Sequence, residues 1–136
     1  MGLAQKRIIQ EFQQTNFQKW KEDFDKIVGF PLEMDVKWDT MQNEDYKEKD
    51  QYFSWYEMVY FRPLKEVFEG LCADAMGKEA VKASVKKIVI DGTDGAHPEK
   101  STFENGVFTL RHKFNSNVDQ HEERRKKWSA IIEAKL

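Results

Sequence analysis

The stretch YFSWYEMVYF, residues 52–61, places six aromatic side chains in ten positions, and its conformation decides the fold. If it is extended, alternate residues point to opposite faces of a strand. The first face then carries Phe53, Trp55, Glu57, Val59 and Phe61, and the second carries Tyr52, Ser54, Tyr56, Met58 and Tyr60. Rings without a hydroxyl group favour a core, whereas phenols also suit water or a partner. The extended interpretation therefore predicts a strand with one buried face and one face available for binding.

The same stretch also fits a helix whose face is formed by Phe53, Tyr56, Tyr60 and Leu64. Such a helix would run into the segment after Pro63 and be kinked there. We favour the strand, because aromatic and β-branched residues are common in strands and a proline follows. Glu57 is the weak point of this interpretation, since it shares the apolar face, where a buried carboxyl group is a candidate acid or base.

The residues before this stretch predict a helix, a strand and a loop. In residues 3–28 apolar side chains recur every three or four positions, which is typical of one amphipathic helix. Gly29 and Pro31 suit its end, because glycine adopts the left-handed cap and proline cannot continue the hydrogen bonding. Residues 32–38 alternate between apolar and polar, which indicates a strand, and the polar residues 39–51 indicate a solvated loop.

Two more helices are predicted after this stretch. The helical period returns in residues 64–76, between Pro63, which suits a first helical residue, and Gly77, which suits a helix end. Residues 119–136 have the last helical pattern, with an apolar stripe that includes Trp128.

The strands of a meander lie between these helices. Residues 85–90 are rich in β-branched side chains, and residues 106–114 alternate. Asn105-Gly106 is a hairpin signal that adds residues 101–104 as a short strand. The complete order is α-β-(β)-α-β-β-α. It predicts the α+β class: a single small domain over residues 1–136, with a mostly antiparallel sheet of three to four strands and helices packed on one face.

Composition indicates a globular protein without an evident catalytic signature. Apolar residues make up 40% of the 136 positions and charged residues 34%, with no apolar run long enough to span a membrane. Cys72 is the single cysteine and there is no leading apolar segment, so we expect a cytoplasmic location. Phosphate-binding, dinucleotide-binding, serine-hydrolase and zinc-protease motifs are absent. We therefore expect no cofactor and favour a non-enzymatic role.

Charge is unevenly distributed along the sequence. Residues 33–57 carry eight acids against three bases, and residues 111–136 carry seven bases against four acids. The net charge of −2 disfavours nucleic-acid binding, which needs a basic field at the phosphates. Four of the bases lie in the run ERRKKW, where Arg124 and Arg125 precede Trp128 by about one turn. We expect their stems to cover apolar surface and their charged ends to stay in water.

Two sites of possible chemistry have ordinary structural explanations. Asp91, Asp94 and His97 are weak candidate metal ligands, but turn formation explains the same loop, so no metal is predicted. Cys72 lies on an apolar helical face and is expected to be a small buried residue. His112 alternates with apolar residues, and with Glu57 it is a weak candidate for catalysis.

These observations favour a small module that binds another protein, as an adaptor or a neutralising, immunity-type protein does. The predicted contact residues are Tyr52, Tyr56, Tyr60, Glu44, Asp45, Glu48 and Asp50. Tyrosine suits interfaces, and the acidic segment favours a basic partner. The alternative is a small-ligand protein or small enzyme with a pocket between helices and sheet, using Glu57 and His112. A homo-oligomer is a third possibility.

Overall fold

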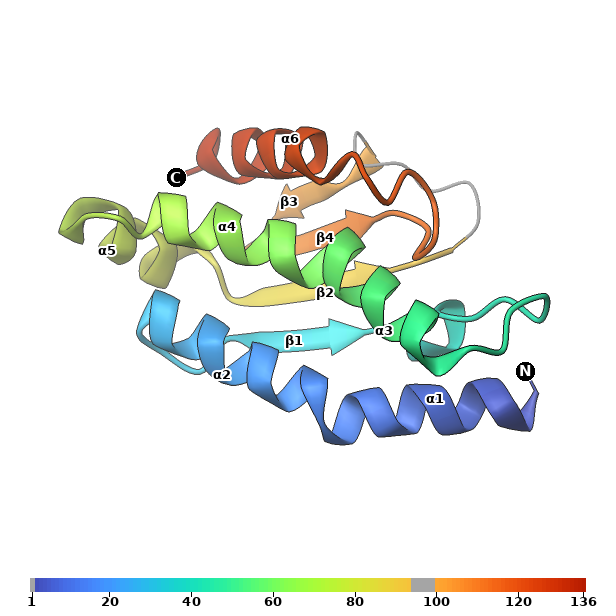
Figure 1. Ribbon diagram of the computed structural model, residues 1–136. Helices are drawn as coiled ribbons and strands as arrows, with labels where there is room; N and C mark the ends of the chain where they lie inside the picture. Colours follow the sequence, from blue (N-terminus) through green and yellow to red (C-terminus); the bar gives the residue numbers. More distant parts are fainter. Residues whose placement is uncertain (1, 94–99) are drawn as a thin grey trace.

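The structure is a computed structural model that describes residues 2–93 and 100–136. A four-stranded sheet carries a layer of helices (Figure 1), so the predicted α+β class is confirmed. The strands are β1 (Glu33–Val36), β2 (Lys87–Asp91), β3 (Thr102–Glu104) and β4 (Val107–Arg111). The helical segments are α1 (Leu3–Gln14), α2 (Asn16–Val28), the 3-10 turn η1 (Trp38–Thr40), α3 (Lys49–Tyr56), the π-helical turn η2 (Glu57–Phe61), α4 (Arg62–Leu71), α5 (Ala75–Ser84) and α6 (His121–Glu133). The buried apolar residues of these elements form one hydrophobic core within the described part of the chain.

The sheet is mixed, with the strand order β1-β2-β4-β3. β1 pairs with β2 and β2 pairs with β4 in parallel; among the described strands, only β3 and β4 are antiparallel. The predicted mostly antiparallel sheet is therefore wrong. Parallel neighbours need a long crossover connection, and α3 to α5 supply it between β1 and β2.

One face of the sheet is buried beneath the helices. In the two central strands Ile88, Ile90, Phe108 and Leu110 are fully buried, and the residues that alternate with them are more exposed. Such alternation is typical of strands that pack on a core with one face only. In Figure 1, α4 passes in front of the sheet, and α6 packs beside α4.

Residues 52–61 are helical, so the predicted strand is wrong. They form the end of α3 and all of η2, and the helix continues directly into α4 (Figure 1). Tyr52, Tyr56 and Tyr60 are at most 1% exposed, whereas the strand interpretation places them on the wet face. Phe61 is in the core, but Phe53 and Trp55 are only partly buried. The tyrosines recur every four residues, and this helical spacing outweighs the strand preference of the individual residues.

The helix widens at η2, directly before Pro63. The N–H of Arg62 bonds to the carbonyl of Glu57, five residues back, which is the π-helical step. Pro63 has no N–H, so it cannot donate to the carbonyl of Val59 or of Met58. Pro63 does lie in the first turn of α4, as predicted, but the helix continues through η2 into α3.

The N-terminal helical region consists of two helices, where the sequence predicts one. Thr15 interrupts it with φ −120° and ψ −88°, and the Thr15 hydroxyl donates to the carbonyl of Glu11 at 2.7 Å. A hydroxyl group that bonds the backbone locally competes with regular helix bonding. The end of α2 is as predicted, because Gly29 adopts the left-handed conformation with φ 83°.

The region after Pro63 also contains two helices. α4 ends at Leu71, and Asp74 begins α5 by accepting a hydrogen bond from the N–H of Gly77 at 2.8 Å. The prediction that Gly77 ends a helix is wrong. A Cβ atom at Gly77 would lie 1.8 Å from the carbonyl oxygen of Leu71, so glycine is needed here for a close approach of two backbone segments.

The C-terminal elements follow the sequence closely. Asn105 and Gly106 have φ angles of 52° and 80°, as a tight turn between β3 and β4 requires. In α6, Trp128 and Ile132 of the predicted stripe are fully buried, whereas Leu136, at its predicted end, lies beyond the helix and is 39% exposed. None of the helices in the described residues combines the length and hydrophobicity needed to cross a membrane.

Candidate functional site

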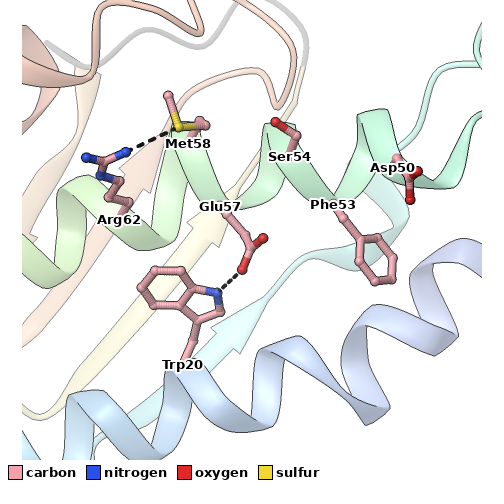
Figure 2. A pocket seen from close by; sticks show the side chains of 7 residues that line it. All are labelled: Trp20, Asp50, Phe53, Ser54, Glu57, Met58 and Arg62. Atoms are coloured by element: carbon pink, nitrogen blue, oxygen red, sulfur yellow. Dashed lines mark hydrogen bonds between the residues drawn. The ribbon is translucent and has the colours of Figure 1, made fainter.

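A groove of about 400 Å³ runs between α2 and the continuous helix α3–η2. Its lining residues are Trp20, Asp50, Phe53, Ser54, Glu57, Met58 and Arg62, as Figure 2 shows. We call this set the α2–α3 groove. All of them except Trp20 come from one helix, at spacings of three, four, seven, eight and twelve residues from Asp50. These spacings place side chains on one helical face, which leaves the buried tyrosines on another.

Glu57 and Trp20 form the floor of the groove. The indole N–H of Trp20 donates to the Glu57 carboxylate at 2.7 Å. The Trp20 ring also stacks on Phe61, with centroids 5.9 Å apart. A carboxylate has two oxygens and can accept several hydrogen bonds, so Glu57 retains capacity for a further donor. The groove therefore offers an oriented negative charge beside an aromatic surface.

The aromatic rings of the groove already attract cations of the chain itself. The Lys65 ammonium lies 5.9 Å from the centroid of the Trp20 ring, and the Lys49 ammonium lies 5.8 Å from that of Phe53. Both lysines also pair with carboxylates, at 3.6 Å to Asp23 and 3.2 Å to Glu11. The rim thus combines ring surfaces and acids, the chemistry that binds ammonium and guanidinium groups.

An acidic segment adjoins the groove in the sequence. Glu44, Asp45 and Glu48 are exposed in the connection before α3, and Asp50, in the first turn of α3, is exposed and lines the groove. These are the four acidic residues predicted to contact a partner, and all four are accessible. The accessible part of the predicted surface is therefore its acidic part, and the aromatic residues that line the groove, Trp20 and Phe53, lie outside the prediction.

The three tyrosines that were predicted to contact a partner instead form hydrogen bonds in the interior. The Tyr52 hydroxyl lies 2.7 Å and 2.8 Å from the carbonyl oxygens of Asn43 and Tyr46. The Tyr56 and Tyr60 hydroxyls donate to the carbonyls of Met41 and His112. Burial raises the pKa of Tyr56 and raises that of Tyr60 well above its usual value. These phenols therefore hold loops onto the helix, and their predicted exposure to a partner is wrong.

Arg124 holds η2 from the side opposite to the groove. Its guanidinium donates to the carbonyls of Val59 at 3.2 Å and Met58 at 3.3 Å, which are the two acceptors that Pro63 cannot serve. It also donates to the carbonyls of Asn117 and, at 2.9 Å, Val118. Arg124 is 1% exposed, and burial lowers its pKa. The predicted solvated end of this side chain is wrong, whereas Arg125 lies near the surface and pairs with Glu122 and Glu66.

The two weak catalytic candidates do not form a pair at one site. Glu57 lines the α2–α3 groove and contacts Trp20, and the groove does not include His112. His112 is 2% exposed, and its Nε2 lies 2.7 Å from the carbonyl oxygen of Ser116. A catalytic acid and base must reach the same reacting atoms. The described contacts of Glu57 and His112 do not bring the two side chains to one such position.

The candidate metal ligands are only partly described. Asp91 accepts hydrogen bonds from the N–H and the hydroxyl of Thr93, as in the predicted turn. Asp94 and His97 lie outside the described residues. Within residues 2–93 and 100–136, no group of three acidic, histidine or cysteine side chains is arranged to hold a metal ion. Cys72 caps α4, is half-buried, and its thiol pKa is raised by burial.

No protein-family model, curated protein or solved structure matches this chain. The α2–α3 groove and its charges are therefore the basis for a proposed function. The sequence-based prediction did not include Trp20, Phe53, Ser54, Met58 and Arg62 as site residues, although the helical spacing from Asp50 to Arg62 is visible in the sequence.

Proposed function

We propose that the protein is a binding module that holds a basic segment of a protein partner in the α2–α3 groove. The observation that carries the proposal is the Glu57 carboxylate, held by Trp20 in an aromatic groove that the exposed Asp50 also lines. Opposite charges accelerate encounter with such a partner and fix its register. Aromatic rings add contact area for the hydrocarbon parts of lysine and arginine.

The groove itself supplies the partner's chemistry. Asp50 and Glu57 stand on one helical face, with Arg62 at the far end of that face. The ammonium groups of Lys49 and Lys65 face the aromatic rings, but both also pair with carboxylates outside the groove lining. An acidic partner would meet two carboxylates, whereas a basic one is attracted by both. The same charges disfavour a nucleic acid as the partner. A cytoplasmic location and the adaptor or neutralising role belong to this proposal.

Capture experiments with charge-matched variants test the proposal. Wild type, an Asp50→Asn and Glu57→Gln double variant, and a Glu69→Gln and Glu79→Gln control are used as bait in a lysate of the source cells. Both double variants change the net charge by the same amount, but Glu69 and Glu79 are exposed residues outside the groove. We expect a protein that wild type and the control recover and the groove variant does not.

Direct binding must then locate the contact. The indole N–H resonance of Trp20, assigned with a Trp20→Phe variant, is followed while the recovered protein is added. A shift of this resonance supports the proposal. Identical recovery by all three baits, or a recovered protein that leaves the Trp20 resonance unchanged, contradicts it.

A small ligand in the same groove is the second candidate. Its volume of about 400 Å³ is within the range of small-molecule sites. A metabolite pool from the source cells that shifts the Trp20 resonance without any protein partner would favour this alternative over the first proposal.

A further inference from the structure

The spacing of the groove carboxylates defines the partner segment more closely. We infer that this segment is extended in the polyproline II form, an inference that rests on the proposed function. It carries two cationic side chains three residues apart, one for Asp50 and one for Glu57.

Helix geometry gives the spacing. Asp50 and Glu57 are seven residues apart on one face of a continuous helix. At 1.5 Å per residue this separation is about 10 Å along the helix axis. A polyproline II segment has three residues per turn and advances about 9 Å in one turn, so its residues i and i+3 face the same side at a matching distance. In a β-strand residues i and i+3 point to opposite faces, which excludes simultaneous contact.

The lining of the groove suits an extended segment. Its volume of about 400 Å³ has room for a few side chains, and aromatic rings line it. Aromatic-lined grooves are a known setting for polyproline II recognition, because a preformed extended segment loses little entropy on binding.

Each cation has a defined place. The first approaches the Glu57 carboxylate, where Trp20 donates to Oε2 and a carboxylate can accept further hydrogen bonds. Its hydrocarbon stem lies along the Trp20 ring, which Figure 2 shows beside Glu57. The second cation meets Asp50 beside Phe53, where it takes the place that the Lys49 ammonium holds over the ring.

Arg62 sets the direction of the segment. It lies one turn beyond Glu57, contacts Met58 through Nη1, and is 56% exposed. A third cation in line with the first two would meet this guanidinium and be repelled. A carboxylate at that position would be attracted. The groove therefore selects two cations followed by a neutral or acidic residue, and it disfavours an uninterrupted basic run.

Peptide isomers test the spacing. The probes are three blocked proline-rich octapeptides of identical composition, each with two lysines, placed at i and i+1, at i and i+3, or at i and i+5. Binding is followed by the Trp20 indole N–H resonance. We expect the i and i+3 isomer to bind about fivefold more tightly than the others, the gain that one additional exposed ion pair gives.

Three single variants assign the two contacts. Asp50→Asn and Glu57→Gln should each remove the preference for the i and i+3 isomer, whereas the charge-matched Glu69→Gln variant should keep it. Equal binding of the three isomers to wild type overturns the spacing inference. If that equal binding still depends on Glu57, the proposed function stands without it. If no isomer shifts the Trp20 resonance, and no captured protein does either, both fail.

Discussion

The interior side and the groove side of η2 belong to the same helical turn but have different roles. On the interior side, the carbonyls of Met58 and Val59 are bound by Arg124, and the Tyr60 hydroxyl is bound by a loop carbonyl. On the groove side, Glu57 has one hydrogen-bond donor, Trp20, and is reachable from outside. Satisfied buried polar groups make a structure rigid, whereas polar groups with remaining capacity can bind. The comparison indicates that the interior side anchors the groove side.

Removing the Arg124 guanidinium should have the largest effect on stability. Arg124→Met should lower the free energy of unfolding by about 3–5 kcal/mol, because several buried carbonyls lose their donor. Urea unfolding measures the change. Arg125→Met is the control, since Arg125 has exposed ion pairs and should cost about 1 kcal/mol or less. Equal losses in the two variants would mean that Arg124 does not hold η2.

High pH should weaken the interior side next. Burial raises the pKa of Tyr56 and Tyr60, so the folded state keeps protons that the unfolded chain loses above about pH 10. The free energy of unfolding should therefore fall as pH rises, by up to about 1.4 kcal/mol per pH unit for each phenol. Urea unfolding between about pH 9 and 11 measures this slope.

Two variants assign that slope to the buried phenols. A Tyr56→Phe and Tyr60→Phe double variant should flatten it, whereas Tyr46→Phe, which changes a 39% exposed residue, should not. A slope that is unchanged in the double variant would contradict the assignment.

We expect a smaller energetic coupling between Pro63 and Arg124. Pro63→Ala restores an N–H that can reach the carbonyl of Val59, one of the acceptors that Arg124 serves. In an Arg124→Met background this N–H should recover about 1 kcal/mol relative to the sum of the single changes. A double-mutant cycle in urea measures the coupling. Pro63→Ala and Arg125→Met, the control pair, should be additive. If Pro63→Ala and Arg124→Met are additive as well, Arg124 does not replace the missing donor.

The smallest effect on stability should come from the groove side. In Glu57→Gln the amide oxygen can still accept the Trp20 N–H, so we expect a change of about 0.5 kcal/mol or less in the free energy of unfolding. Urea unfolding tests this against Arg124→Met under identical conditions. A loss of more than about 2 kcal/mol would show that Glu57 belongs to the stabilising interior, and the contrast between the two sides would disappear.

Local sequence patterns predict the positions of most helices and strands. They fail for the conformation of residues 52–61 and for the direction of strand pairing in the sheet. Reading residues 52–61 as a strand also produces the antiparallel sheet, because a helix there is the crossover that makes β1 and β2 parallel. Tyr52, Tyr56 and Tyr60 show the helical spacing in the sequence. Their aromatic character outweighed it, since a phenol suits both an interface and a buried bond to a carbonyl.

The site depends on contacts that no local pattern contains. Val59 and Arg124 are 65 residues apart, and Trp20 and Glu57 are 37 apart. The burial of Arg124 follows from carbonyls that Pro63 leaves without a donor, and only the packing of α6 against α4 brings the guanidinium to them. The acidic residues 44 to 50 are accessible, as the sequence predicts, because polar loop residues need no distant contact to remain in water.

The parallel pairing of β1 and β2 also sets an order of events during folding. Val36 and Lys87 belong to adjacent strands, yet all of α3, η2, α4 and α5 lies between them in the chain. Closing so long a segment costs more chain entropy than closing the two-residue turn between β3 and β4. The hairpin can therefore form locally within microseconds, and we expect β1 to join the sheet later than the hairpin.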